Sequence, residues 1–409
     1  KVRKKIYVIH PLNKPDQQAR ESGIRQQACR RPVTAAVVLS LFVATGCSKQ
    51  SESSAQRQPE PESSELSQSL DSISSENGVV GYAIGLVAGG RLVYAHAFGE
   101  KELGSGINLT TKSVFHWASV SKPFVATAIM QLSERGEFDL DARLVDVLPG
   151  YRTSERRHGD VTVRQLLLHT SGTPDVEDYE WDQPAYDDDA LRRWVLEESP
   201  RDLLFDPGSD RRYSNVGYEI LGLIVEEVSG QTFEAYMERN IFGPLAMTDT
   251  TFYYPDVPEH LRTVGHRGET QRRPIDDYPY NRRHAPSSTL NTNVEDLARF
   301  VLALLNGGEL EGARILERGT LDDMWHPRWT EQESPLRASA MGWVVEDFNG
   351  HRMVRHFGSD DGFRSALLIF PDDQSALFLV TNDETTPTRD IALTALADLF
   401  AAESAGKQE

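Results

Sequence analysis

The segment that decides the fold is residues 115–123, which read FHWASVSKP and lead into an apolar run. The apolar spacing predicts a helix from Pro123 to Glu134. Proline is tolerated where a helix begins, because its missing N–H would have no partner there, so the helix starts within a turn of Ser119. Ser119 and Lys122, three residues apart, then share one face. A serine hydroxyl becomes nucleophilic when a base takes its proton, and a lysine can be that base if burial lowers its pKa.

Two later segments carry compatible chemistry. Tyr213-Ser214-Asn215 opens a helical run, where a phenol can relay a proton and an amide can bind a carbonyl. His356-Phe357-Gly358-Ser359 ends a predicted strand, whose edge can hold an extended substrate. Each motif alone has a plain alternative, since Ser-x-x-Lys is frequent by chance and Ser214 can simply cap a helix.

The periodicity outside these motifs predicts strands at both ends of the chain and helices between them. The expected strands are 78–87 and 91–99, which form a hairpin, and 341–346, 352–356, 365–369 and 377–380. The expected helices are 123–134, 163–168, 218–228, 233–240, 294–305 and 389–402, and Thr292 with Glu295 is a predicted capping box.

This order predicts an α+β fold, in which an antiparallel β-sheet is flanked by terminal helices and an all-α lobe is inserted. The domain is expected over residues 75–405, with a sheet lobe formed by 75–118 and 335–405 and a helical lobe formed by 119–334. Residues 48–74 are rich in Ser, Glu, Gln and Pro and are expected to be a flexible tether, within which Ser64–Ile73 can form a first helix.

Residues 1–47 read as a leader. Two arginines precede a short apolar run, Val33–Val43, which ends in Ala44-Thr45-Gly46-Cys47. The run is shorter than the roughly 20 residues that a membrane-spanning helix needs. The pattern resembles a bacterial lipoprotein signal with Cys47 as the lipidated residue, and an ordinary secretory signal is the alternative.

Composition narrows the possible partners. The net charge of -19 gives no basis for binding nucleic acid, which requires clustered Lys and Arg. The only cysteines, Cys29 and Cys47, lie in the leader, and the 11 histidines form no His-x-x-x-His or His-x-His pair. No metal site and no cofactor are therefore expected.

Together and in this order, the three motifs resemble the serine β-lactamase and penicillin-binding-protein superfamily. The branch that is most similar contains class C β-lactamases, D-alanyl-D-alanine carboxypeptidases and related esterases, a likeness strengthened by LLLHTSG at 166–172 and by Gly342-Trp343. The resemblance covers about residues 78–400 and implies the β-lactamase/transpeptidase-like fold.

The resemblance also implies roles for individual residues. Ser119 would be the nucleophile, Lys122 the base and Tyr213 a proton carrier shared with Lys122. Substrate would be bound by Asn215 and by the strand segment His356, Gly358 and Ser359, and the backbone N–H groups of Ser119 and Ser359 would form an oxyanion hole.

Two departures from relatives and one loop bear on the substrate. Penicillin-active relatives commonly have Lys-Thr-Gly where this chain has His356-Phe357-Gly358, so a permanent cation is replaced by a group with an ordinary pKa near ~6.5. We expect His356 to gain its charge towards pH 6 and then to attract carboxylates. The segment 285–290 reads APSSTL where relatives tend to have paired glycines, which predicts a different loop shape. The acidic loop 173–182 either favours cationic substrates or is only a solvated surface.

These observations predict an exported, lipid-anchored serine hydrolase on the periplasmic face of a bacterial membrane, which acts on an ester, an amide or a D-amino-acid peptide. A true β-lactamase or peptidoglycan carboxypeptidase is one alternative. The other is a non-catalytic envelope protein that binds peptidoglycan or a partner.

Overall fold

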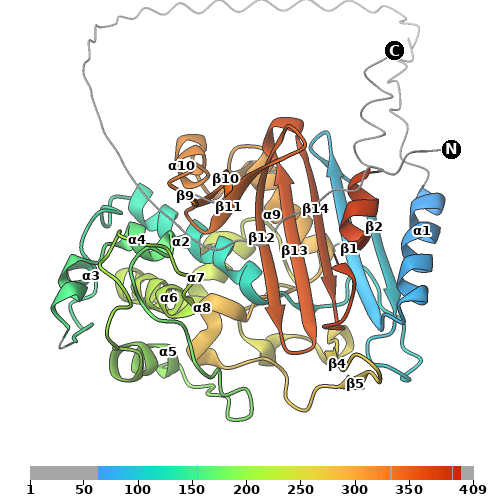
Figure 1. The fold of residues 1–409 in the computed structure, drawn as a ribbon, viewed down its shortest axis with the longest axis horizontal. Helices are drawn as coiled ribbons and strands as arrows, with labels where there is room; N and C mark the ends of the chain where they lie inside the picture. The colour runs from blue at the N-terminus through green and yellow to red at the C-terminus, as the bar shows by residue number, and fades with distance from the viewer. Residues whose placement is uncertain (1–62, 154, 332–333, 389, 398–409) are drawn as a thin grey trace, which may run out of the picture.

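An antiparallel sheet of eight strands organises the molecule (Figure 1). The computed structural model describes residues 63–153, 155–331, 334–388 and 390–397. The strand order is β2-β1-β14-β13-β12-β11-β10-β9, so strands from the two ends of the chain lie beside each other. The bounds are β1 Gly81–Ala88, β2 Arg91–Gly99, β9 Trp329–Glu331, β10 Ser334–Ala340, β11 Trp343–Phe348, β12 His351–Asp360, β13 Phe363–Phe370 and β14 Ser375–Thr381.

Both faces of the central strands are covered, which explains why β1 and β14 are almost continuously apolar. Tyr82 and Ile84 of β1 face an outer cluster with α1 (Ser63–Glu76) and the helical residues 390–397. Ala83, which points to the opposite face, joins the main core. The sheet therefore separates two hydrophobic clusters.

The chain between the hairpin and β9 forms helices, short strands and connecting loops, and its helices pack against one side of the sheet (Figure 1). Its α-helices are α2 Ser121–Glu134, α3 Leu144–Val147, α4 Val163–Leu167, α5 Ala190–Arg193, α6 Asn215–Ser229, α7 Phe233–Met237, α8 Ala285–Ser288, α9 Val294–Leu305 and α10 Arg318–Met324. Short ladders join β3 (Phe115–His116) to β6 (Asn291–Thr292), β4 (His266–Arg267) to β5 (Arg273–Pro274), and β7 (Glu309–Leu310) to β8 (Ala313–Arg314).

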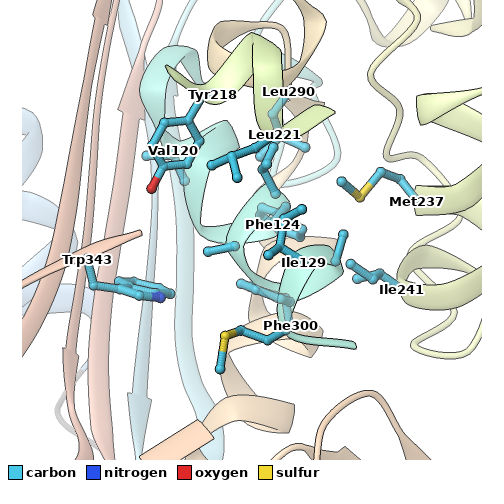
Figure 2. Close-up of a cluster of buried hydrophobic side chains, with 14 of the residues drawn as sticks. Val120, Phe124, Ile129, Tyr218, Leu221, Met237, Ile241, Leu290, Phe300 and Trp343 are labelled. Atoms are coloured by element: carbon cyan, nitrogen blue, oxygen red, sulfur yellow. The ribbon is translucent and has the colours of Figure 1, made fainter. Parts of the chain in front are cut away.

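Helix α2 is the centre of the main core. Every residue from Ser121 to Leu132 is buried, because other elements pack around the whole helix. Figure 2 shows Phe124 and Ile129 of α2 among side chains from α6, α9 and the segment after α7. The Phe124 ring stacks on Phe300 with 3.9 Å between ring centroids. The helix that begins beside Ser119 is thus held on all sides.

The structure corrects two details of the sequence analysis. The predicted tether is too long, because α1 already begins at Ser63 and buries Leu66 and Leu70. The predicted capping box of Thr292 and Glu295 does not form. Asn293 is the N-cap of α9 and accepts a hydrogen bond from the N–H of Asp296 at 2.8 Å, since Thr292 already belongs to β6 and its hydroxyl bonds to Thr250.

The predicted C-terminal helix of 389–402 is helical where the structure describes it, over residues 390–397. The leader 1–47, Cys47 and most of the tether lie outside the described residues. Within the described part of the chain, none of the helices combines the length and the apolar character needed to cross a membrane.

Candidate active site

Ser119 lies in a single 3₁₀ turn, η1 (Ala118–Val120), directly before α2. Ala118 has a positive φ of 48°, a conformation that costs energy for a residue with a Cβ and is held here by its surroundings. The carbonyl oxygen of Trp117 accepts a hydrogen bond from Ser365 Oγ of β13 at 2.8 Å, and the Trp117 indole donates to the carbonyl of Thr292 at 2.9 Å. The turn is therefore anchored to the sheet on one side and to β6 on the other.

Lys122 is fully buried and directs its ammonium group at three oxygens. Its Nζ lies 3.1 Å from Ser119 Oγ, 2.6 Å from Asn215 Oδ1 and 2.7 Å from the carbonyl oxygen of Ser287. Burial lowers the pKa of Lys122 to about 8, and nearby carboxylates oppose this shift only in part. A sizeable fraction of the amine is consequently uncharged at neutral to mildly basic pH.

Tyr213 reaches the same hydroxyl from the segment before α6. Its phenol interacts with the side chain of Ser119, and its ring centroid lies 4.9 Å from Lys122 Nζ. Burial raises the Tyr213 pKa well above its ordinary value, so the group is a neutral phenol rather than a phenolate. The structure thus brings Ser119, Lys122 and Tyr213 within contact of one another.

His169 orders the Tyr213 side of the site. Its ring packs on Tyr213 with 4.4 Å between centroids, and its Nδ1 accepts a hydrogen bond from the N–H of Ser214 at 3.2 Å. His169 also has a positive φ of 60°, a left-handed conformation that histidine adopts more often than most residues. Burial lowers its pKa well below the ordinary value, so the ring is neutral.

Asn215 is fixed by a residue that the sequence analysis did not single out. Asp175 Oδ1 accepts hydrogen bonds from the backbone N–H of Asn215 at 2.8 Å and from its Nδ2 at 2.9 Å. The Asn215 amide is thereby oriented so that Oδ1, and not the amino group, faces Lys122. Asp175 belongs to the acidic loop, but only a contact between loop and helix, which is invisible in sequence spacing, assigns it this role.

Strand β12 forms the opposite wall. The ladder between β11 and β12 ends at the pair Val344–Arg355, so among the described residues no strand pairs with the following residues of β12 on that side. A Cβ on Gly358 would lie 2.4 Å from the carbonyl oxygen of Trp117, which explains why only glycine lets the strand approach the Ser119 turn so closely.

These elements enclose a cleft of about 450 Å³ around Ser119, called the Ser119 cleft below. It is lined by all the predicted catalytic and substrate-binding residues except Lys122, which is fully buried. The lining residues are Ser119, His169, Tyr179, Arg211, Tyr213, Asn215, Arg337, Gly342, Trp343, Val344, Arg355, His356, Phe357, Gly358, Ser359 and Asp360.

The expectation that His356 gains a charge towards pH 6 is wrong. Burial and the proximity of Lys122 lower its pKa to about 3, so the imidazole is neutral throughout the range in which the protein would act. Its Nδ1 lies 2.8 Å from the carbonyl oxygen of Phe357, a geometry in which the ring nitrogen donates. His356 shapes the wall of the cleft without supplying a cation.

The cations of the cleft are arginines instead. Arg355 is nearly buried and forms two hydrogen bonds with the Glu346 carboxylate, at 2.7 and 2.9 Å, so its charge is matched. Its guanidinium also lies 4.6 Å from the ring of Phe357, which is 51% exposed. Arg337 of β10 faces the cleft, and within the described part of the chain no carboxylate lies at ion-pair distance from it.

Asp360 is a second residue that sequence reasoning missed. It lies at the end of β12, next to Ser359, and its Oδ2 accepts hydrogen bonds from His116 Nε2 at 2.8 Å and from Ser288 Oγ. Ser288 belongs to the segment 285–290, where the structure has the short helix α8. That this loop differs in shape from the loops of relatives stays a prediction.

The acidic loop contributes to the cleft through an aromatic residue rather than through a field of carboxylates. Tyr179 lines the cleft and stacks on Trp181, with ring centroids 4.6 Å apart. Asp178 and Asp182 lie instead at a separate hollow with Arg267 and Asp276. Among the described residues, no group of three or more His, Cys, Asp or Glu side chains is arranged to hold a metal ion.

The sequence also matches the model of a known protein family. The Beta-lactamase family model matches residues 64–402, which is most of the chain. The chain belongs to the Beta-lactamase family. It is a serine hydrolase of this family, and the order of its motifs and its mixed helical and antiparallel-sheet fold agree with that assignment.

Curated proteins that are similar to this chain include penicillin-binding proteins. Penicillin-binding protein 4 of Amycolatopsis lactamdurans is 30% identical over 330 residues, which are 76% of this chain and 83% of that protein. Other curated relatives are matched over only 60 to 66% of their own length, so the chain spans less than two thirds of those proteins.

Three solved structures share the fold. An octameric penicillin-binding protein homologue from Pyrococcus abyssi is 24% identical with a TM-score of 0.72, over 83% of this chain and 78% of that one. A D-stereospecific amidohydrolase from Streptomyces sp. is 22% identical with a TM-score of 0.67, over 81% and 98%. A β-lactamase/D-alanine carboxypeptidase from Pseudomonas syringae is 20% identical with a TM-score of 0.68, over 82% and 98%. At these identities the likeness concerns the fold.

Proposed function

We propose that this chain is an exported hydrolase that forms an acyl-enzyme on Ser119 with an ester, an amide or a D-amino-acid peptide. The observation that carries the proposal is the hydrogen bond of 3.1 Å between Lys122 Nζ and Ser119 Oγ, made by a buried amine whose pKa is about 8. A lysine in this state can accept the serine proton near neutral pH.

In the proposed reaction, Ser119 Oγ attacks the substrate carbonyl carbon while neutral Lys122 takes the hydroxyl proton. The oxyanion is stabilised by the N–H groups of Ser119 and Ser359. The neutral Tyr213 phenol donates its proton to the leaving group, and the Lys122 ammonium returns a proton to Tyr213. Water then attacks the acyl-enzyme and releases the acid, which regenerates Ser119.

The side chains that line the cleft support the proposed substrate classes. Phe357 and Tyr179 offer apolar and aromatic surface, while the charge on Arg337 is unmatched among the described residues. The names of the structural neighbours, a D-stereospecific amidohydrolase and a D-alanine carboxypeptidase, support including amides and D-amino-acid peptides beside esters.

The test is to incubate the protein with short p-nitrophenyl esters, nitrocefin and a fluorescent penicillin, alongside Ser119→Ala. Ester turnover that disappears in Ser119→Ala supports the proposal. Nitrocefin turnover or labelling by the penicillin favours the alternative of a β-lactamase or peptidoglycan carboxypeptidase. If none of the three compounds is turned over or labels the protein, and the protein binds isolated peptidoglycan, a non-catalytic envelope protein is favoured.

Export and lipidation are a separate part of the proposal and rest on the sequence of residues 30–47. The expected result is that the full chain, expressed in bacteria, incorporates a labelled fatty acid and sediments with membranes. The Cys47→Ala variant should lose the label. Incorporation that persists in this variant would contradict an anchor at Cys47.

A further inference from the structure

A buried carboxylate that the proposed reaction does not use lies behind Lys122. Glu219 is fully buried on α6, four residues after Asn215, so one face of this helix carries both groups. Its Oε2 accepts a hydrogen bond from the backbone N–H of Ser287 at 3.2 Å. The carbonyl of the same residue, Ser287, accepts from Lys122 Nζ at 2.7 Å. A single residue of the main chain therefore links Glu219 to the lysine.

The second oxygen of Glu219 faces His284, whose Nδ1 lies 3.3 Å away. The ring is buried against Tyr179 and Trp194, and its Nε2 has no hydrogen-bond partner within the part of the chain that the structure describes. Glu219 is thus held between the N–H of Ser287 and the His284 ring.

We propose that Glu219 is a positioning residue for Lys122, which holds the Ser287 carbonyl against the amine and supplies the buried negative charge that keeps part of the lysine protonated. This inference rests on the proposed function, because it concerns the residue that accepts the Ser119 proton. Of the three carboxylates that oppose the lowering of the Lys122 pKa by burial, Glu219 has the largest effect, before Asp360 and Asp175.

The charges around Lys122 decide whether its pKa rises or falls when the charge of Glu219 is removed. The groups that surround it are the aromatic side chains Tyr213 and Tyr218, the histidines His169 and His356, and the carboxylates Glu219, Asp360 and Asp175. Negative charge stabilises the ammonium form, so removing the charge of Glu219 lowers the Lys122 pKa further. The uncharged amine then persists to lower pH.

The test is the rate at which a fluorophosphonate probe labels Ser119 between pH 5.5 and 9.5, since this readout needs no knowledge of the substrate. In Glu219→Gln, the acid limb of the rate profile should move to lower pH. The rate at pH 6.5, divided by the plateau of the same variant, should rise about three- to tenfold, as half to one pKa unit requires. A residue with only a structural role would lower the plateau and leave the limb in place.

Glu226→Gln is the matched control. Glu226 lies on the same helix and is largely buried, but it bonds to the N–H of Phe233 and is not among the carboxylates that act on Lys122. The acid limb of the labelling-rate profile of Glu226→Gln should coincide with that of the unaltered chain. A folded Glu219→Gln protein with an unmoved limb overturns the proposal and leaves the hydrolase function standing. An unaltered chain that is not labelled at any pH overturns both.

Glu219→Asp provides the test if Glu219→Gln does not fold. The shorter side chain keeps the charge but withdraws the carboxylate from the Ser287 N–H, so the labelling plateau should fall about tenfold. A folded Glu219→Asp protein with an unchanged plateau would overturn the positioning role.

Discussion

Lys122 illustrates how the surroundings of a residue set its chemistry. An exposed lysine is charged at neutral pH, whereas burial brings the pKa of this one to about 8. We predict that kcat/KM for a neutral p-nitrophenyl ester rises with pH and levels off above an inflection near pH 8, because only the uncharged amine accepts the Ser119 proton. The measurement is a pH profile from 5 to 10, with the rate of Ser119→Ala subtracted at each pH.

The same profile also tests His356. Since its pKa is about 3, no inflection should occur between pH 5 and 7, and the ratio of activities on carboxylate-bearing and neutral esters should stay constant over that range. A ratio that changes around pH 6 would show that the imidazole titrates there and would contradict this prediction.

Tyr213 is predicted to act through its hydroxyl and not through its ring. Tyr213→Phe keeps the ring packed on His169 but removes the hydroxyl that is proposed to carry the proton, so kcat should fall about 100- to 10,000-fold while KM changes by no more than a few-fold. Tyr236→Phe is the control, because this buried hydroxyl bonds to Gln131 in the core, away from the cleft. Equal losses of kcat in both variants would argue against a proton-transfer role.

At the scale of elements, the close approach of β12 to the η1 turn is the critical contact. Gly358→Ala would place a Cβ 2.2 Å from Ser365 Oγ and 2.4 Å from the carbonyl oxygen of Trp117, so strand or turn must shift. We predict a loss of kcat/KM of at least about 100-fold, as expected for reacting groups displaced by about 1 Å. Gly319→Ala, whose added Cβ would meet nothing within 4 Å, should retain activity.

Helix α2 connects that contact to the core. Its first turn carries Lys122, and the buried residues that follow, including Phe124 and Ile129, fix its direction (Figure 2). A nucleophile and a base on a fully enclosed helix start need little reorganisation during the reaction. This is a physical reason for building the site at the boundary between sheet and helices rather than on a mobile loop.

For the molecule as a whole, the sheet separates the outer cluster from the core beneath the site. We predict that Leu70→Ala, which opens a cavity under α1, lowers the free energy of unfolding by about 2–5 kcal/mol and leaves kcat and KM at 25 °C unchanged. Denaturant unfolding followed by circular dichroism measures the first quantity. Leu103→Ala, at a side chain that is 50% exposed, should change stability by less than about 0.5 kcal/mol.

The sheet that separates these two clusters is built from both ends of the chain. Strand β1 pairs with β14 over Tyr82–Thr381 to Val87–Ala376, so the sheet joins strands that are far apart in the sequence. Such long-range pairing makes folding slow relative to a protein of local contacts. It also brings the terminal helical segments together on one face (Figure 1).

The sequence by itself determined the elements and the order of the motifs. Apolar periodicity is a local property, and it predicted the hairpin of β1 and β2, the four strands β11 to β14, and the long helices α2, α6 and α9. The family resemblance, carried by short motifs with their own local geometry, led to Ser119, Lys122, Tyr213 and the β12 segment.

Only the tertiary structure decided the electrostatics and the supporting contacts. The pKa values of Lys122 and His356 depend on burial and on charges distant in sequence, and for this reason the sequence misjudged His356. Asp175, Glu219 and Asp360 carry no motif, because their roles arise from hydrogen bonds across 40, 68 and 244 positions of the chain. Local pattern specifies which residues can react, and long-range packing specifies their charge and their geometry.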